Sequence, residues 1–166
     1  MRETQEAIAA WAQESFGLAR SLQRVLARAV EEGAELLRAI TSDKPTAEIV
    51  EEAADVSIVL ARYMVLSGSV LPMFELVELP DVSRRPALER AARAVALLGK
   101  ALETDRISEA CMHVKTAQVA LLMLAKESGV SLLDAIDAKM SINRTRTWRK
   151  DATGHGYHVR DRGVAA

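Results

Sequence analysis

The sequence predicts an all-α protein, organised as an antiparallel four-helix-type bundle with additional helices. About half of its 166 residues are apolar (49%), but only 4% are aromatic. The core must therefore consist mainly of Ala, Leu, Val, Ile and Met, which suits packed helices better than sheets. Apolar residues recur at helical spacing over several long segments. Short turns separate these segments, and short connections make successive helices antiparallel neighbours.

The bounds of the expected helices follow from this spacing and from residues typical of helix ends. Gly17 and Gly68 are natural stops for the first and third helices. Pro86 suits the first turn of a later helix, and Ser131 followed by Asp134 resembles a capping box at the start of the last one. The expected helices cover residues 3–16, 18–41, 46–67, 70–79, 86–103, 106–128 and 131 to about 147.

The chain is expected to form one domain, because its length supports a single substantial core. We assign residues 1–149 to an all-α bundle. The tail, 150–166, has glycines at 154, 156 and 163 and shows no apolar period. We expect this tail to be mobile or to close over another part of the molecule, with the GHGYH motif (154–158) as the candidate lid.

Charge and cysteine content limit the compartment and the partners. The formal net charge of −1 gives no general attraction to a nucleic acid polymer or a membrane. The single Cys111 excludes an internal disulfide and fits a reducing compartment. The N-terminal segment carries acidic residues and does not resemble a signal or transit peptide. No apolar run approaches the roughly 20 residues of a membrane span, so we expect a cytoplasmic protein.

Two acidic clusters lie on either side of one short turn. Glu32 and Glu35 are three residues apart before the turn. Glu52 and Asp55 are three apart after it, so each pair lies on one face of its helix. Apolar residues at core spacing surround both pairs, so we expect four carboxylates around one partly buried zone, where like charges raise each other's pKa. Mg²⁺, or alternatively Mn²⁺, would relieve this repulsion, because both ions prefer carboxylate oxygens.

A basic segment follows at the end of the last expected helix. Five Lys and Arg residues and no acidic residue lie between 139 and 150. Lys139 and Asn143 are four apart and share one helix face, which Arg146 continues. An acidic metal site beside a Lys/Asn/Arg face is what a polyphosphate substrate needs, because the metal bridges phosphate oxygens and the cations hold the remaining charge. The alternative is a solvated basic helix end that complements the helix dipole.

These motifs, in this order, resemble the all-α nucleoside triphosphate pyrophosphatase superfamily, which includes MazG-like enzymes, dCTP pyrophosphatases, dimeric dUTPases and phosphoribosyl-ATP pyrophosphohydrolase. The matching patterns are EExxE and EExxD within 28–60 and KMxxNRxR from Lys139. The resemblance implies Mg²⁺-dependent hydrolysis of an NTP or dNTP to the monophosphate and pyrophosphate. We expect Arg146 to hold the substrate together with the residues implied by the motif. The resemblance implies metal-binding and catalytic roles for Glu32, Glu35, Glu52 and Asp55, and nucleotide contacts for Lys139 and Asn143.

The chain also departs from compact MazG-like subunits, because a second helical hairpin separates the EExxD helix from the Lys/Asn helix. A shift of 61 residues places Ser67-Gly68 on Ser128-Gly129, so this hairpin is a candidate internal duplicate. Identities are few, and helical hairpins resemble one another easily, so duplication stays open. In this alignment, the four acidic positions correspond to Arg93, Ala96, His113 and Thr116.

Several questions stay open at this point. The chain could instead be an inactive nucleotide-binding or regulatory module, or a phosphoribosyl-ATP pyrophosphohydrolase. The proton acceptor could be any carboxylate of the cluster, Glu31 or Glu51. Base specificity is also open, although Trp11 and Trp148 are candidates for stacking. Apolar surface on the second hairpin and on 70–79 favours a homodimer.

Overall fold

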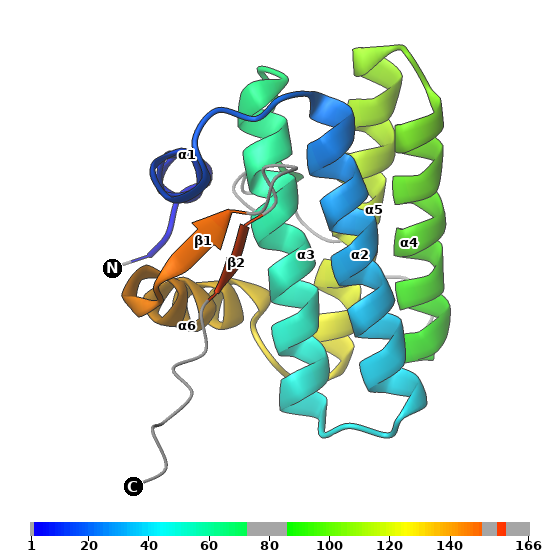
Figure 1. Ribbon diagram of the computed structural model, residues 1–166. Helices are drawn as coiled ribbons and strands as arrows, with labels where there is room; N and C mark the ends of the chain where they lie inside the picture. Colours follow the sequence, from blue (N-terminus) through cyan, green and yellow to red (C-terminus); the bar gives the residue numbers. More distant parts are fainter. Residues whose placement is uncertain (1, 73–85, 151–155, 159–166) are drawn as a thin grey trace, which may run out of the picture.

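The structure is a computed structural model that describes residues 2–72, 86–150 and 156–158; for 150 and 156–158 it describes only the backbone. Helices dominate this part of the chain (Figure 1), which confirms the predicted all-α fold class. None of the helices in the described ranges is long and apolar enough to cross a membrane. The helices are α1 (Gln5–Phe16), α2 (Leu22–Thr41), α3 (Thr46–Leu66), α4 (Ala87–Glu103), α5 (Ile107–Glu127) and α6 (Leu132–Thr145).

Four of these helices form the bundle. The hairpin α2–α3 packs beside the hairpin α4–α5, with α2 against α4 and α3 against α5. Helices α1 and α6 both pack against α3, on the side away from α4 (Figure 1). Helix α3 is therefore the central element. Both predicted hairpins are present, while their common origin by duplication stays a prediction.

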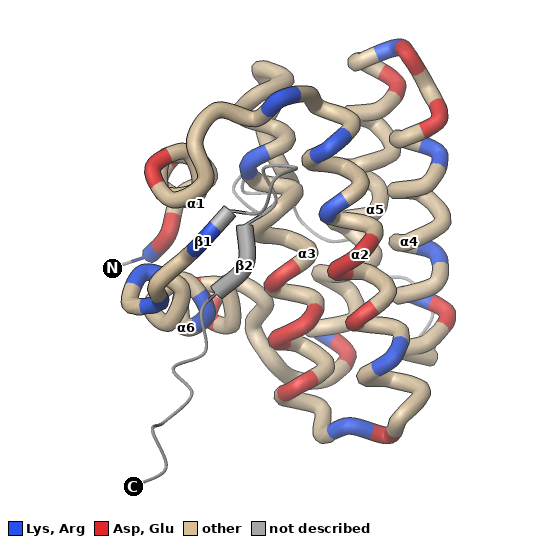
Figure 2. The backbone as a smooth tube through the Cα atoms, viewed as in Figure 1, with Lys and Arg blue, Asp and Glu red and all other residues tan. Residues whose placement is uncertain are grey.

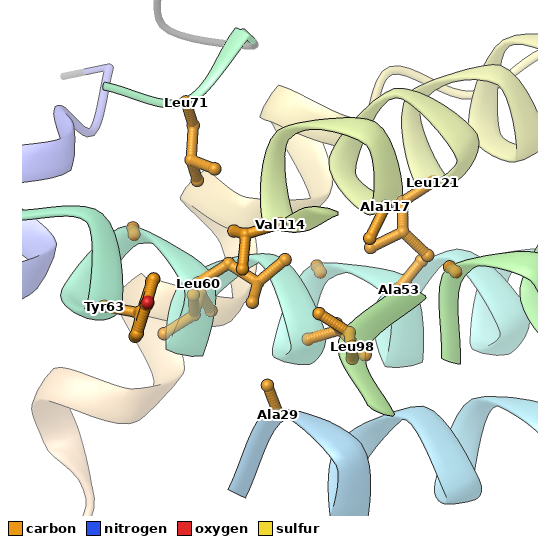
Figure 3. Close-up of a cluster of buried hydrophobic side chains, with 14 of the residues drawn as sticks. Ala29, Ala53, Leu60, Tyr63, Leu71, Leu98, Val114, Ala117 and Leu121 are labelled. Carbon is orange, nitrogen blue, oxygen red and sulfur yellow. The ribbon is translucent and has the colours of Figure 1, made fainter. Parts of the chain in front are cut away.

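Small and branched apolar side chains fill the space between the helices. Figure 3 shows Ala29 of α2, Leu60 of α3 and Leu98 of α4 within the shared core, and all three are fully buried. Alanines allow two helix backbones to approach closely, and leucines fill the gaps that remain. At Gly33 of α2, an added Cβ would lie 2.7 Å from Cγ2 of Val95 on α4. A larger residue at this position would force the Val95 side chain or the helix to shift.

The second helix begins later than the sequence suggested. We expected it to start at residue 18, but α2 starts at Leu22. The hydroxyl of Ser21 accepts a hydrogen bond from the backbone N–H of Arg24 at 3.2 Å, which caps the helix. Gly17 ends α1 with a φ of 74°, a conformation that glycine adopts without strain. The side-chain cap at Ser21 thus sets the start of α2.

The chain after α6 forms a short ribbon that the sequence did not predict. Helix α6 ends at Thr145, two residues before its expected end. The strand β1 (Trp148–Lys150) then pairs antiparallel with β2 (Gly156–His158). The indole N–H of Trp148 donates to the carbonyl of Asn143 at 2.9 Å, which turns the chain back over α6. The predicted lid role of the GHGYH motif falls on residues 154–155, outside the described part, and on 156–158, described in backbone only.

Two further regions named by the sequence analysis lie largely outside the described residues. These are the expected short helix over 70–79 and the loop over 81–85. The described end of that region is held by α1, because Gln5 donates from its amide to the carbonyl of Ser69 at 2.8 Å and accepts from the N–H of Leu71 at 2.7 Å. Helix α6 is likewise tied to the N-terminal segment by an ion pair between Arg144 and Glu3 at 2.7 Å.

Candidate metal and phosphate site

Carboxylates of α2 and α3 meet where the two helices lie side by side. Figure 2 shows acidic segments on neighbouring turns of these helices. One carboxylate oxygen from each of Glu32, Glu52 and Asp55 lies within 4.8 Å of the other two. Glu32 comes from α2, and the other two come from successive turns of α3. The structure thus brings together three of the four carboxylates that the sequence singled out; we call these three residues the acidic cluster.

Glu35, the fourth predicted ligand, occupies a different position. Its side chain is exposed to solvent, and it does not belong to the group of three oxygens within 4.8 Å. Its charge nevertheless acts on the cluster, because it contributes to the raised pKa values of Glu32 and Glu52. Glu35 therefore lies on the exposed edge of the site.

The acidic cluster resists ionisation. Burial is the main cause that raises the pKa of Glu32 from 4.5 to about 7, and the charges of Asp55 and Glu52 contribute further. Burial also raises the pKa of Glu52 and of Asp55. Carboxylates that are both desolvated and close to one another favour their neutral forms unless positive charge compensates them. The cluster is therefore a place where a cation gains strong stabilisation.

One compensating charge comes from α6. The ammonium Nζ of Lys139 lies 2.6 Å from Oδ2 of Asp55, and this pair joins α6 to α3. Burial is the largest single influence on Lys139 and lowers its pKa. The charge of Asp55, the hydrogen bond to Asp55 and the charges of Glu52 and Glu51 together outweigh burial, so the net pKa is raised. Lys139 counteracts part of the increase that burial causes in the pKa of Asp55. Lys139, predicted to bind substrate, thus reaches the acidic cluster directly.

The other two predicted substrate residues lie on the same side. Asn143 is buried, with 5% of its surface exposed. Its side-chain oxygen accepts a hydrogen bond at 3.2 Å from the guanidinium of Arg146. The charge of Arg146 lowers the pKa of Asp55, which shows that this guanidinium lies near the cluster. Lys139 therefore contacts the acidic cluster, the charge of Arg146 acts on it, and Asn143 holds Arg146.

Arg28 also belongs to the site, and the sequence analysis did not identify it. It lies one turn before Glu32 on α2 and forms ion pairs with both Glu32 and Glu31, the latter at 2.9 Å. Its charge lowers the pKa of Glu32 and of Asp55. The sequence could have identified Arg28 by its spacing of four residues from Glu32, because side chains at this spacing meet on a helix.

Trp11 and Trp148 belong to one aromatic group, in which Trp148 is partly exposed, so base stacking by Trp148 stays a prediction. Trp11, Phe16 and Trp148 pack edge to face, with ring centroids 5.0, 5.4 and 5.7 Å apart. Trp11 is only 8% exposed, so it belongs to the core. Arg62 of α3 lies over Phe16, 5.9 Å from the ring centroid. This aromatic group fixes α1 against β1 and α3.

The donor set of the acidic cluster fits a hard divalent cation. All three candidate ligands are carboxylates, and Mg²⁺ and Mn²⁺ prefer oxygen donors, whereas zinc sites use His and Cys more often. No protein-family model, curated protein or solved structure matches the chain in the comparisons that we made.

Proposed function

We propose that the protein is a Mg²⁺-dependent nucleoside triphosphate pyrophosphohydrolase, which converts an NTP or dNTP to the monophosphate and pyrophosphate. The main support is the juxtaposition of two groups of opposite charge. Three carboxylate oxygens lie within 4.8 Å of one another. Lys139 of α6 contacts Asp55, and the positive charge of Arg146, just after α6, also acts on Asp55. A metal–polyphosphate complex needs both groups, because carboxylates bind the metal and cations bind the phosphate oxygens.

Each group of residues has a distinct role in this proposal. The acidic cluster would hold Mg²⁺, which supplies neutralisation of phosphate charge and a lower pKa for the attacking water. Lys139 and Arg146 would hold the polyphosphate oxygens, with Arg146 oriented by its hydrogen bond to Asn143. The proton of the water would pass to a nearby carboxylate, and Glu31, Glu35 and Glu51 at the exposed edge are candidates besides the cluster itself.

A second candidate function is a helical nucleotide-binding or regulatory module without catalysis. One observation favours it: protein cations already pair with two of the three clustered carboxylates, Arg28 with Glu32 and Lys139 with Asp55. Such internal pairing neutralises part of the cluster without a metal ion. A module of this kind would be stabilised thermally by nucleotides without releasing product. A phosphoribosyl-ATP pyrophosphohydrolase is tested by including that compound among the substrates.

The direct test is a pyrophosphate-release assay over normal and modified nucleoside triphosphates and phosphoribosyl-ATP. We expect release from at least one substrate with Mg²⁺ or Mn²⁺ and none in EDTA. Asp55→Asn and Glu52→Gln should each lower kcat/KM by about 100-fold or more, because each removes a charge that the metal and the transition state need. No release from any substrate, together with nucleotide-induced thermal stabilisation, would favour the binding module.

The matched control is Glu48→Gln, on the same helix as the two site variants. Glu48 is exposed and pairs only with exposed Lys44 among the contacts that the structure records for it, at 3.2 Å. Exposed pairs of this kind contribute little to stability, so kcat/KM should stay within about 2-fold of the wild-type value. Wild-type rates in Asp55→Asn and Glu52→Gln would overturn the proposal.

A further inference from the structure

Arg28 and Lys139 reach the acidic cluster from opposite sides. Arg28 comes from α2 and pairs with Glu32, and Lys139 comes from α6 and pairs with Asp55. Both positive charges lower the pKa of Asp55, so Asp55 lies within the range of each. The cluster is therefore flanked by a cation on each side, and only the one on α6 was part of the predicted substrate face.

The position of Arg28 conflicts with metal binding at the cluster. Its guanidinium pairs with the Glu32 carboxylate, which is one of the three clustered groups. A metal ion that takes Glu32 as a ligand brings two positive charges next to this guanidinium, so the two cations repel each other. Binding of the metal and the Arg28–Glu32 pair are thus competing arrangements of the same carboxylate.

Arg28 can leave Glu32 without becoming buried and unpaired. Its side chain is 33% exposed, and it also contacts Glu31, whose side chain is 55% exposed. A long, partly exposed arginine can change rotamer at small cost. Its planar guanidinium offers several donors in a geometry that suits phosphate oxygens. The released side chain would therefore stay at the edge of the site with its donors available.

We propose that Arg28 gives up Glu32 when a divalent cation binds and then holds the polyphosphate of the substrate from the α2 side, opposite Lys139. This inference rests on the proposed function. It assigns two successive roles to one side chain: a counter-ion of the cluster before the metal binds, and a phosphate ligand afterwards. Removal of Arg28 must then have opposite effects on two affinities, which a purely structural role does not produce.

The test consists of two calorimetric titrations of the full chain at pH 8.5. In the first, Mn²⁺ is added to the metal-free protein, and Arg28→Gln should bind it about 5-fold tighter than the wild type because the competing charge is gone. In the second, inorganic pyrophosphate is added with Mg²⁺ at saturation, and the same variant should bind about 10-fold more weakly because a charge-assisted contact is lost.

Two further variants serve as controls. Arg38→Gln removes the same charge from an exposed position in the last turn of α2, and both affinities should stay within about 2-fold of wild type. Arg28→Lys keeps the charge but not the forked contact with two carboxylates. It should bind Mn²⁺ up to about 2-fold tighter than the wild type and keep pyrophosphate affinity within about 3-fold of the wild-type value. If Arg28→Gln folds poorly, these two affinities of Arg28→Lys serve as the test.

The outcomes separate this inference from the proposed function. Absence of Mn²⁺ binding to the wild-type protein would contradict both. Wild-type Mn²⁺ binding with Arg28→Gln no tighter, or with unchanged pyrophosphate affinity, would overturn the role of Arg28 and leave the proposed function standing. Loss of both affinities in Arg28→Gln would show that Arg28 only supports the structure of the site.

Discussion

Glu32 carries the strongest electrostatic conflict among the three clustered carboxylates. It is 8% exposed, and burial together with its acidic neighbours raises its pKa to about 7. At neutral pH the metal-free protein must therefore either hold a proton on Glu32 or keep a buried charge that Arg28 compensates only in part. This conflict gives a direct test of the electrostatics without any substrate.

The stability of the metal-free protein should fall as pH rises from about 4.5 to about 7. In this range the folded state holds a proton on Glu32 that the unfolded state has already lost, since the pKa is raised from 4.5 to about 7 on folding. Unfolding therefore becomes easier as pH increases, by up to about 3 kcal/mol from this group. Burial shifts Glu52 and Asp55 in the same direction.

Glu32→Gln should remove that contribution. In EDTA at pH 8, the free energy of unfolding of this variant should exceed the wild-type value by about 1–3 kcal/mol, because no charge has to be buried. At pH 5 the two proteins should differ by less than about 1 kcal/mol. Urea unfolding followed by circular dichroism at both pH values measures this, and a difference that does not depend on pH would contradict the assignment.

Individual residues show how far the sequence could predict the site. The three-residue spacing identified Glu32, Glu52 and Asp55, because helical periodicity alone places them on inward-facing stripes. The same spacing also selected Glu35, which is exposed. Helical periodicity shows which residues share a face, but it does not show which of them lie at the solvent-exposed edge of that face. The contact between Lys139 and Asp55 joins residues far apart in the chain, and only the docking of α6 on α3 reveals it.

Helix α2 shows how one position controls the packing of a whole element. Gly33 lies next to Glu32 and faces Val95 of α4, with no room for a methyl group. Glycine in a helix interior is otherwise unfavourable by roughly 1 kcal/mol relative to alanine. Its presence here therefore reflects the close packing of α2 against Val95 of α4.

Gly33→Ala and Gly99→Ala should change stability in opposite directions. The first should lower the free energy of unfolding by about 1 kcal/mol or more, because overpacking against Val95 outweighs the gain in helix propensity. The second should raise it by about 0.5–1 kcal/mol, because a Cβ at Gly99 of α4 meets nothing within 4 Å. Denaturant unfolding of both variants measures the effects, and stabilisation by Gly33→Ala would mean that α2 and α4 lie farther apart.

At the level of elements, long helices were predictable and short strands were not. The helices α2 and α3 have many turns of apolar spacing and one short connection, so their hairpin followed from the sequence. Strands β1 and β2 have three residues each, which is too short for an alternating pattern to stand out. The start of α2 was misplaced because the side-chain cap at Ser21 outweighed apolar spacing that continues upstream.

In the whole molecule, the site lies between the first hairpin and α6. Among the described residues, the clustered carboxylates lie on α2 and α3. The flanking cations lie on α2, on α6 and just after α6. The second hairpin supports α2 and α3 from the other side. One chain thus supplies both hairpins of the four-helix bundle. The origin of the hairpins by duplication and the formation of a homodimer both stay predictions.

The central claim is that Glu32, Glu52 and Asp55 together bind a divalent cation. Anomalous diffraction from crystals grown with Mn²⁺ tests it most directly. We predict an anomalous peak among these three carboxylates, with Arg28 turned away from Glu32. The absence of a peak there, with the Arg28–Glu32 and Lys139–Asp55 pairs intact, would contradict the claim.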